Sequence, residues 1–210
     1  MCGSAVVFGV MNAIAELQPE MNVVAIVPST HNMLGGSAYK PGDILTAYNG
    51  KTIEVLNTDA EGRLILADAL AYASKNYDPE YMLDFATLTG AVVVTLGHIA
   101  TGLMSNNDTL VENIKVSSDN TGEHVWQLPL WDEYCDQVKS DVADVKNLGS
   151  PGQAGTIAGA AFLKAFVGKD IPWAHFDVAG TSYHVENRSY IQKNSASGQV
   201  IRLVLDLLGA

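Results

Sequence analysis

The sequence predicts a protein of the α/β class, in which helices and strands alternate along the chain and pack in layers. Apolar residues recur at helical spacing in several segments, and short β-branched runs lie between those segments. The chain has 210 residues, of which 48% are hydrophobic, so it can build one substantial core. No repeat or low-complexity linker interrupts the pattern, and we therefore expect a single domain over residues 1–210.

The helices are predicted from apolar spacing and from the residues that end each run. Residues 3–17 carry small and apolar side chains at helical spacing, and the run ends at Gln18-Pro19-Glu20. Residues 91–97 fit either a helix or a strand. Further helices are expected at 62–75, 156–167 and 197–209, and residues 108–118 are amphipathic.

The strands are predicted from β-branched runs and from turn residues. The run at 22–28 ends at Pro28 and is typical of a buried strand. Residues 44–55 predict a β-hairpin, because Asn49-Gly50 is the preferred pair for a tight primed turn. Other strands are expected to begin at residue 81 and to cover 100–106 and 173–180, with loops at 29–43 and 136–156.

Composition disfavours several functional classes. The net charge of −11 makes the chain a poor phosphate binder, so nucleic acid is not expected as a partner. No stretch approaches about 18 uninterrupted apolar residues, so no membrane span is predicted. The two cysteines, Cys2 and Cys135, lie far apart and form no C-x-x-C motif, which is typical of a reduced, intracellular protein. We expect a cytoplasmic location.

The stretch "NTDAEGRLIL" at 57–66 has two interpretations. Thr58 and Glu61 fit a capping box at a helix start, and Arg63 would then be a solvent-facing residue of the first turn. Alternatively, Asp59, Glu61 and Arg63 lie at alternate positions and would share one face of an extended segment, where carboxylates can bind a divalent cation. Two carboxylates alone do not complete a metal site, so the local sequence leaves both interpretations open.

The wider context of this stretch carries a resemblance to a known family. "NTDAEGRL" at 57–64 resembles the signature of the leucyl aminopeptidases, the M17 dinuclear metallopeptidases. Further blocks are similar to the same family, at 33–73, 84–91, 128–134, 154–163 and 173–181. The resemblance implies a three-layer α/β/α sandwich with a mixed, largely parallel sheet, truncated at its N-terminal side. In the family a metal-binding lysine, two metal-binding aspartates and a catalytic lysine precede the methionine that Met1 matches.

The resemblance also implies a role for each signature residue. The residue matching Asp59 binds one metal ion, and the residue matching Glu61 bridges two ions, which are manganese or zinc. Such a pair lowers the pKa of the shared water and polarises the scissile carbonyl. The residue matching Arg63 holds a bicarbonate-like anion that assists proton transfer, a task suited to the planar fork of a guanidinium.

Substrate contacts are implied in two later blocks. In "ATLTG" the matching residues are Thr87, Leu88 and Gly90, and in "DVAGT" Ala179 matches a position that lines the first specificity pocket. The alternative for all four residues is ordinary packing at a strand end.

Histidine and serine chemistry is not predicted. The five histidines show no metal-binding spacing and are expected to be ordinary core or surface residues: His31, His98, His124, His175 and His184. No serine lies in a G-x-S-x-G context, which a serine hydrolase of that type requires.

The function implied by the resemblance is release of N-terminal amino acids, leucine-type but broad, from peptide substrates. Family members form hexamers, so a homo-oligomer is expected. The 210 residues alone are expected to be inactive, since the upstream ligands are not among them. Two alternatives remain: an inactive truncated remnant with a structural or interaction role, and a nucleic-acid-binding accessory role, against which the acidic charge argues.

Overall fold

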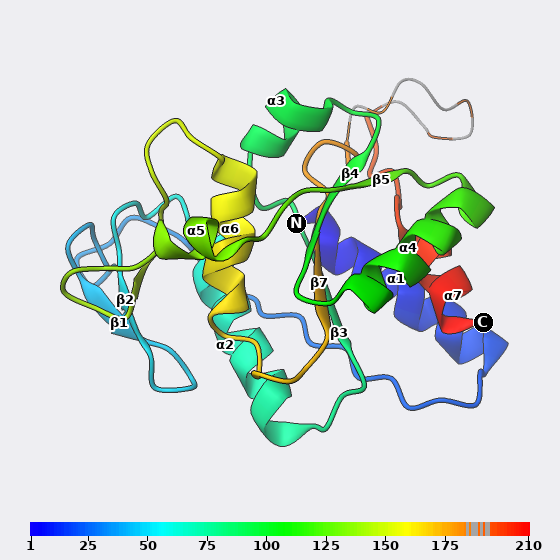
Figure 1. Cartoon of the computed structure of the whole chain (residues 1–210), viewed down its shortest axis with the longest axis horizontal. Helices are drawn as coiled ribbons and strands as arrows, with labels where there is room; N and C mark the ends of the chain where they lie inside the picture. The colour runs from blue at the N-terminus through cyan, green and yellow to red at the C-terminus, as the bar shows by residue number, and fades with distance from the viewer. Residues whose placement is uncertain (184, 186–188, 190, 192–193) are drawn as a thin grey trace. The chain divides into compact units, whose positions relative to one another are not determined.

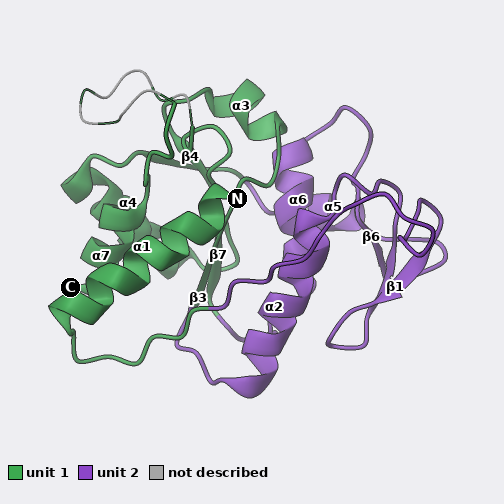
Figure 2. Ribbon diagram, turned by 180° about the vertical axis from the view of Figure 1, so that it is seen from behind, with its two compact units in different colours: residues 1–25, 82–128, 172–210 green, residues 26–81, 129–171 purple. Residues whose placement is uncertain are grey.

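The computed structural model describes residues 1–183, 185, 189, 191 and 194–210. The chain forms two compact units whose sequences interleave (Figure 2). Unit 1 comprises residues 1–25, 82–128 and 172–210, and unit 2 comprises residues 26–81 and 129–171. Each unit contains a sheet and helices of its own, which confirms the α/β class. The expectation of a single domain stays a prediction.

Unit 1 is built on a four-stranded sheet of order β3-β7-β4-β5 (Figure 1). The strands are β3 (Met82–Ala86), β4 (Thr101–Ser105), β5 (Val125–Gln127) and β7 (Trp173–Asp177). β3 and β7 run parallel, as do β4 and β5, whereas β4 is antiparallel to β7. This is the mixed, largely parallel sheet that was predicted. Every residue of β7 is buried, which accounts for its nearly continuous run of large side chains.

The helices of unit 1 pack against this sheet and against one another. They are α1 (Cys2–Leu17), α3 (Ala91–Leu96), α4 (Asp108–Thr121) and α7 (Ile201–Leu208). α1 contacts β3 and α7, while α4 contacts β4, β5, β7 and α7. The close approach of α1 to β3 depends on Gly3, because a side chain there would collide with the carbonyl oxygen of Phe85.

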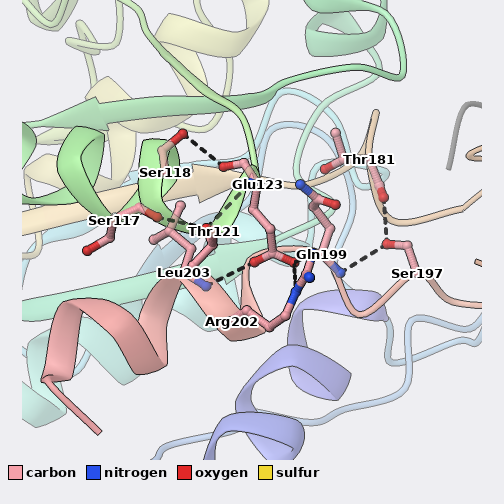
Figure 3. Close-up of polar contacts among 9 residues, drawn as sticks. All are labelled: Ser117, Ser118, Thr121, Glu123, Thr181, Ser197, Gln199, Arg202 and Leu203. Atoms are coloured by element: carbon pink, nitrogen blue, oxygen red, sulfur yellow. Dashed lines mark hydrogen bonds and ion pairs between the residues drawn. The ribbon is translucent and has the colours of Figure 1, made fainter. Parts of the chain in front are cut away.

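The start of α7 is stabilised by a carboxylate from a distant loop (Figure 3). The residue at its N-cap, Val200, has a left-handed φ of 70° and offers no side-chain cap. Glu123 is only 3% exposed, and its Oε2 accepts a hydrogen bond of 3.0 Å from the backbone N–H of Leu203. An anion at this helix end interacts favourably with the unpaired N–H groups and the helix dipole.

Unit 2 contains a three-stranded sheet and three helices. The sheet has the order β1-β2-β6, with β1 (Ile44–Thr46) antiparallel to β2 (Thr52–Glu54) and β2 parallel to β6 (Val145–Lys146). The helices are α2 (Gly62–Asn76), α5 (Asp132–Asp136) and α6 (Gly155–Lys164), and α6 contacts both α2 and α5.

Two sequence-based expectations need correction. The hairpin of β1 and β2 is confirmed, but its turn is not a primed one, because Gly50 has a φ of 88° while Asn49 has no positive φ. The N–H of Ala47 instead bonds to the carbonyl of Lys51, which is typical of a longer loop with a glycine bulge. The strand predicted at 22–28 is wrong: this run lies outside both sheets, and β propensity alone forms no strand without a neighbour to pair with.

The structure bears on membrane spanning and on the two cysteines. None of the helices in the described ranges combines the length and apolar character that crossing a membrane requires. Cys2 and Cys135 are both free thiols and form no disulfide. His184 lies outside the described residues.

Candidate functional site

The segment before α2 forms a turn and not an extended strand. Asp59 lies in this turn, and its backbone N–H donates to the Asn57 side chain at 2.9 Å. The carbonyl of Thr58 accepts hydrogen bonds from the side chains of Asn32 at 3.1 Å and Tyr39 at 3.3 Å. The prediction that Asp59, Glu61 and Arg63 share one face of an extended segment is therefore wrong, since α2 begins at Gly62 and takes Arg63 into its first turn.

The alternative, a capping box, is also not formed. The N-cap of α2 is Glu61, in right-handed helical conformation, and no side chain makes a capping hydrogen bond there. The Glu61 carbonyl nevertheless starts the helix, accepting from the N–H groups of Leu64 at 2.9 Å and Ile65 at 3.2 Å. The acidic side chain of Glu61 thus sits at the positive end of the helix dipole without satisfying its N–H groups.

A buried amide holds the segment in place. Asn147 is completely buried and follows β6, which pairs in parallel with β2. Its side-chain oxygen accepts from the N–H of Leu56 at 2.8 Å, and its side-chain nitrogen donates to the carbonyl of Asn57 at 2.7 Å. One side chain therefore pairs with a backbone N–H group and with a backbone carbonyl group in the segment that leads into the signature. Asn147 was not predicted as a functional residue, because the two-residue β6 lies inside a stretch that the sequence pattern indicated to be a loop.

Arg63 is tied to the same asparagine. The side chain is only 7% exposed, and its Nη1 donates to the backbone carbonyl of Asn147 at 3.0 Å. The interpretation of Arg63 as a solvent-facing residue is therefore wrong. A guanidinium held in a dry environment interacts more strongly with an anion than one in water.

Glu61 lines a cavity of about 260 Å³ within unit 2. The other lining residues include His31, Asn32, Tyr39 and Asp68. Burial, and secondarily the negative charge of Glu61, raise the pKa of the Tyr39 phenol above its ordinary value. Glu61 and Tyr39 thus line the same cavity.

The donor chemistry of Asp59 and Glu61 fits a divalent metal ion, but their number does not complete a site. Carboxylate oxygens suit hard and borderline ions such as manganese and zinc. Within residues 1–183, 185, 189, 191 and 194–210, no three or more histidine, cysteine, aspartate or glutamate side chains gather in a way that could hold a metal ion. These two residues can thus contribute to a metal centre only together with further ligands.

The four predicted substrate residues all belong to unit 1, whereas the predicted metal ligands belong to unit 2. Because β3 and β7 are parallel with Ala86 opposite Asp177, the segments after these strands emerge at the same edge of the sheet. One segment carries Thr87, Leu88 and Gly90, and the other carries Ala179. The carboxyl ends of strands are where α/β sheets bind ligands.

Asp177 connects these two segments. Its Oδ1 accepts from the backbone N–H groups of Leu88 and Ala179, both at 3.2 Å, and its Oδ2 accepts from the Thr89 hydroxyl at 2.7 Å. Burial raises the pKa of Asp177, while the charge of His175 and the hydrogen bonds from Thr89, Ala179 and Leu88 act to lower it. Asp177 was not predicted as a functional residue, although its place at the end of an apolar strand was a usable signal.

The chain folds tightly around this edge. Gly180 needs to be a glycine, because a Cβ there would collide with the carbonyl oxygen of Gly97. The carbonyl of Gly180 also lies 2.6 Å from Nδ1 of His98, so this histidine holds the loop after β7.

Asp84, in the middle of β3, is a second buried carboxylate of the unit 1 sheet. Asp84 pairs with His175 at 2.6 Å between Oδ1 and Nδ1, and its Oδ2 accepts from the indole N–H of Trp173 at 2.8 Å. His175 is completely buried, which decides between the core and surface positions that the sequence left open for it.

Comparison with known proteins decides the family. A model of the catalytic domain of the cytosol aminopeptidase family matches residues 1–205. The chain belongs to this family. Two relatives, each called a probable cytosol aminopeptidase, are those of Desulfotalea psychrophila, 53% identical over 208 residues, and Cenarchaeum symbiosum, 50% identical over 209 residues. Both alignments cover 99% of this chain.

A solved structure supports the same family. A tomato leucine aminopeptidase mutant superposes with a TM-score of 0.87 at 42% identity over 98% of this chain. The resemblance drawn from the signature is therefore confirmed, as is the predicted α/β sandwich. The chain spans 41% and 43% of the two relatives' lengths and 39% of the tomato chain.

Proposed function

We propose that the protein is a metal-dependent aminopeptidase that releases N-terminal amino acids, leucine-type but broad, from peptides. The observation that carries this proposal is the signature turn: Asp59 and Glu61 lie on a segment that Asn147 fastens at the start of α2, in a chain of the cytosol aminopeptidase family. Carboxylates on a rigid segment can keep their positions when a metal ion binds.

Each signature residue has a separate task in this proposal. Asp59 would hold one divalent ion, manganese or zinc, and Glu61 would bridge two. When bound, the two ions would lower the pKa of a shared water and polarise the scissile carbonyl. The buried guanidinium of Arg63, oriented by the Asn147 carbonyl, would hold a bicarbonate-like anion that moves the proton. The further ligands would come from the family's segment preceding the block that Met1 matches.

The edge of the unit 1 sheet would supply the peptide contacts. Thr87, Leu88 and Gly90 would contact the substrate, and Ala179 would line the pocket for its first side chain. A small side chain such as that of Ala179 would suit a pocket for a residue as large as leucine. The net charge of −11 favours the cationic amino group that every unblocked peptide carries.

Three further features of the proposal concern the whole protein. We propose a homo-oligomer, a hexamer as in the family, and a cytoplasmic location, in keeping with the name given to its relatives. We also propose that these 210 residues alone have little activity, because two carboxylates do not retain two ions at useful affinity.

The test compares the 210-residue chain with a longer protein, called the full-length protein below, in which the family's segment of further metal ligands is joined before residue 1. Both are assayed on a leucyl chromogenic amide with added manganese or zinc. We expect turnover from the full-length protein, little from the chain alone, and none from the full-length protein on an N-acetylated leucyl amide. Glu61→Ala should lower turnover at saturating metal further than Asp59→Ala, because a bridging ligand serves both ions. Full-length protein without activity would refute the proposed function, and the reverse order of the two variants would remove the bridging role.

A further inference from the structure

The two segments with predicted substrate contacts meet at a single oxygen atom. Oδ1 of Asp177 accepts from the N–H of Leu88 and from the N–H of Ala179, each at 3.2 Å. Oδ2 adds a bond to the hydroxyl of Thr89, which itself accepts from the N–H of Val92 at 3.3 Å at the start of α3. The side chain is completely buried at the end of β7. Asp177 therefore fixes backbone positions in the segments that follow both β3 and β7.

We propose that Asp177 is a positioning residue for substrate binding, which aligns the 87–90 segment with Ala179 so that both face the same peptide. This inference rests on the proposed function and adds to it a residue that would not itself touch the substrate. A carboxylate suits the task because each oxygen can accept more than one hydrogen bond. The 2.7 Å bond from the Thr89 hydroxyl also has the length typical of a charge-assisted bond, which is stronger than a neutral one.

Asp84 provides a matched control. It is also a buried carboxylate, 7% exposed, on the strand paired with β7, and it accepts hydrogen bonds from buried side chains. Its partners, His175 and Trp173, both lie within β7 and not in the segments with predicted substrate contacts. A variant of Asp84 therefore reports the cost of disturbing a buried carboxylate in this sheet whose hydrogen bonds to His175 and Trp173 do not reach the two segments.

The experiment measures kcat and KM for a leucyl chromogenic amide in the full-length protein and its variants Asp177→Ala, Asp177→Asn and Asp84→Asn. We expect Asp177→Ala to raise KM about tenfold with little change in kcat, as when contacts common to ground and transition states are lost. Asp177→Asn keeps an acceptor for both N–H groups, so it should raise KM only about threefold. Asp84→Asn should lower thermal stability and leave KM unchanged.

The outcomes separate positioning from stability. A wild-type KM in folded Asp177→Ala, or an equal rise of KM in Asp84→Asn, would overturn the proposal. If Asp177→Ala does not fold, Asp177→Asn decides: a KM equal to wild type overturns the proposal, and a rise absent from Asp84→Asn supports it.

A second readout does not depend on activity. Amide hydrogen exchange should be faster at Leu88 and Ala179 in Asp177→Asn than in wild type, and unchanged at these sites in Asp84→Asn. If the wild-type protein releases no N-terminal residue, the proposed function fails. Faster exchange would then still support the alignment of the two segments, and unchanged exchange would refute it.

Discussion

In each unit one buried polar side chain holds a segment that carries proposed functional residues, but the two side chains differ in kind. In unit 2, Asn147 both accepts from Leu56 and donates to Asn57, so a neutral amide fastens the signature turn. In unit 1, Asp177 only accepts, from Leu88, Thr89 and Ala179. The amide adds no charge next to carboxylates proposed to bind metal ions. The carboxylate can accept three hydrogen bonds, but its two bonds to backbone N–H groups, at 3.2 Å, are longer than the bonds of Asn147, and its ionisation in a buried place costs free energy.

The residues that each region carries predict which kinetic constant the region controls. The signature turn carries residues proposed to act on the reacting atoms, so its disturbance should lower kcat. The edge of the unit 1 sheet carries residues proposed to bind the peptide, so its disturbance should raise KM.

The largest effect is expected from Arg63→Ala in the full-length protein. Loss of assistance to proton transfer should lower kcat by about 10²–10⁴-fold while metal content stays near normal. Arg63→Lys should restore little, because an ammonium lacks the planar fork that suits a small oxyanion. Kinetics and metal analysis on the same preparations check both statements. Full activity in Arg63→Ala would remove its catalytic role, and loss of metal together with activity would make it a structural support of the turn.

A smaller decrease in kcat is expected from Asn147→Ala in the full-length protein. Removing a partner that orients metal ligands typically lowers metal affinity or activity about 10–100-fold. Asn147→Asp is the matched variant: it retains an acceptor for Leu56 but replaces the donor to the Asn57 carbonyl by an oxygen. We therefore expect it to be impaired as well. Titration of activity with manganese, at peptide concentrations from below to above KM, measures the metal affinity, kcat and KM. A raised KM for peptide with unchanged metal affinity would contradict the division of tasks between the two regions.

The elements of the fold that could be predicted are those fixed by local sequence. α1 and α2 follow from apolar spacing, and the hairpin of β1 and β2 follows from a glycine turn between β-branched runs. The strand expected at 22–28 was wrong because a strand also needs a neighbour, which no local pattern supplies. The short β6 was missed because its two residues become a strand only through pairing with β2.

Among the proposed functional residues, those in a local motif could be predicted from the sequence, and those that act through distant contacts could not. Asp59, Glu61 and Arg63 were found because eight consecutive residues carry the family signature. The helix start at Gly62 was predicted correctly, but the extended alternative was wrong, since the turn depends on distant hydrogen bonds. Asn147 acts on a backbone N–H 91 residues away in sequence, and Asp177 on one 89 residues away. Such contacts come from tertiary packing, and no spacing rule in one sequence reports them.

The smallest expected effect concerns pH and distinguishes the carboxylate from the amide. Burial raises the pKa of Asp177 in the folded protein, against the opposing influence of His175 and of its hydrogen bonds. The unfolded chain then ionises this group at lower pH than the folded protein does, so the folded state binds more protons in the interval between. The free energy of unfolding contributed by Asp177 is present below the pKa of the unfolded chain and is lost as pH rises through the folded pKa.

Asp177→Asn removes the titration and keeps the shape, so the stability of wild type relative to Asp177→Asn should fall as pH rises through this window. Asn147→Asp reverses the comparison, because it introduces a titrating group where the protein has none. Its stability relative to wild type should also fall as pH rises, since the new carboxylate ionises beside the Asn57 carbonyl. Thermal unfolding of the full-length protein and both variants across the acidic range measures these differences. A difference between wild type and Asp177→Asn that does not change with pH would mean that Asp177 keeps its ordinary pKa, and the contrast between the two regions would then rest on hydrogen-bond geometry alone.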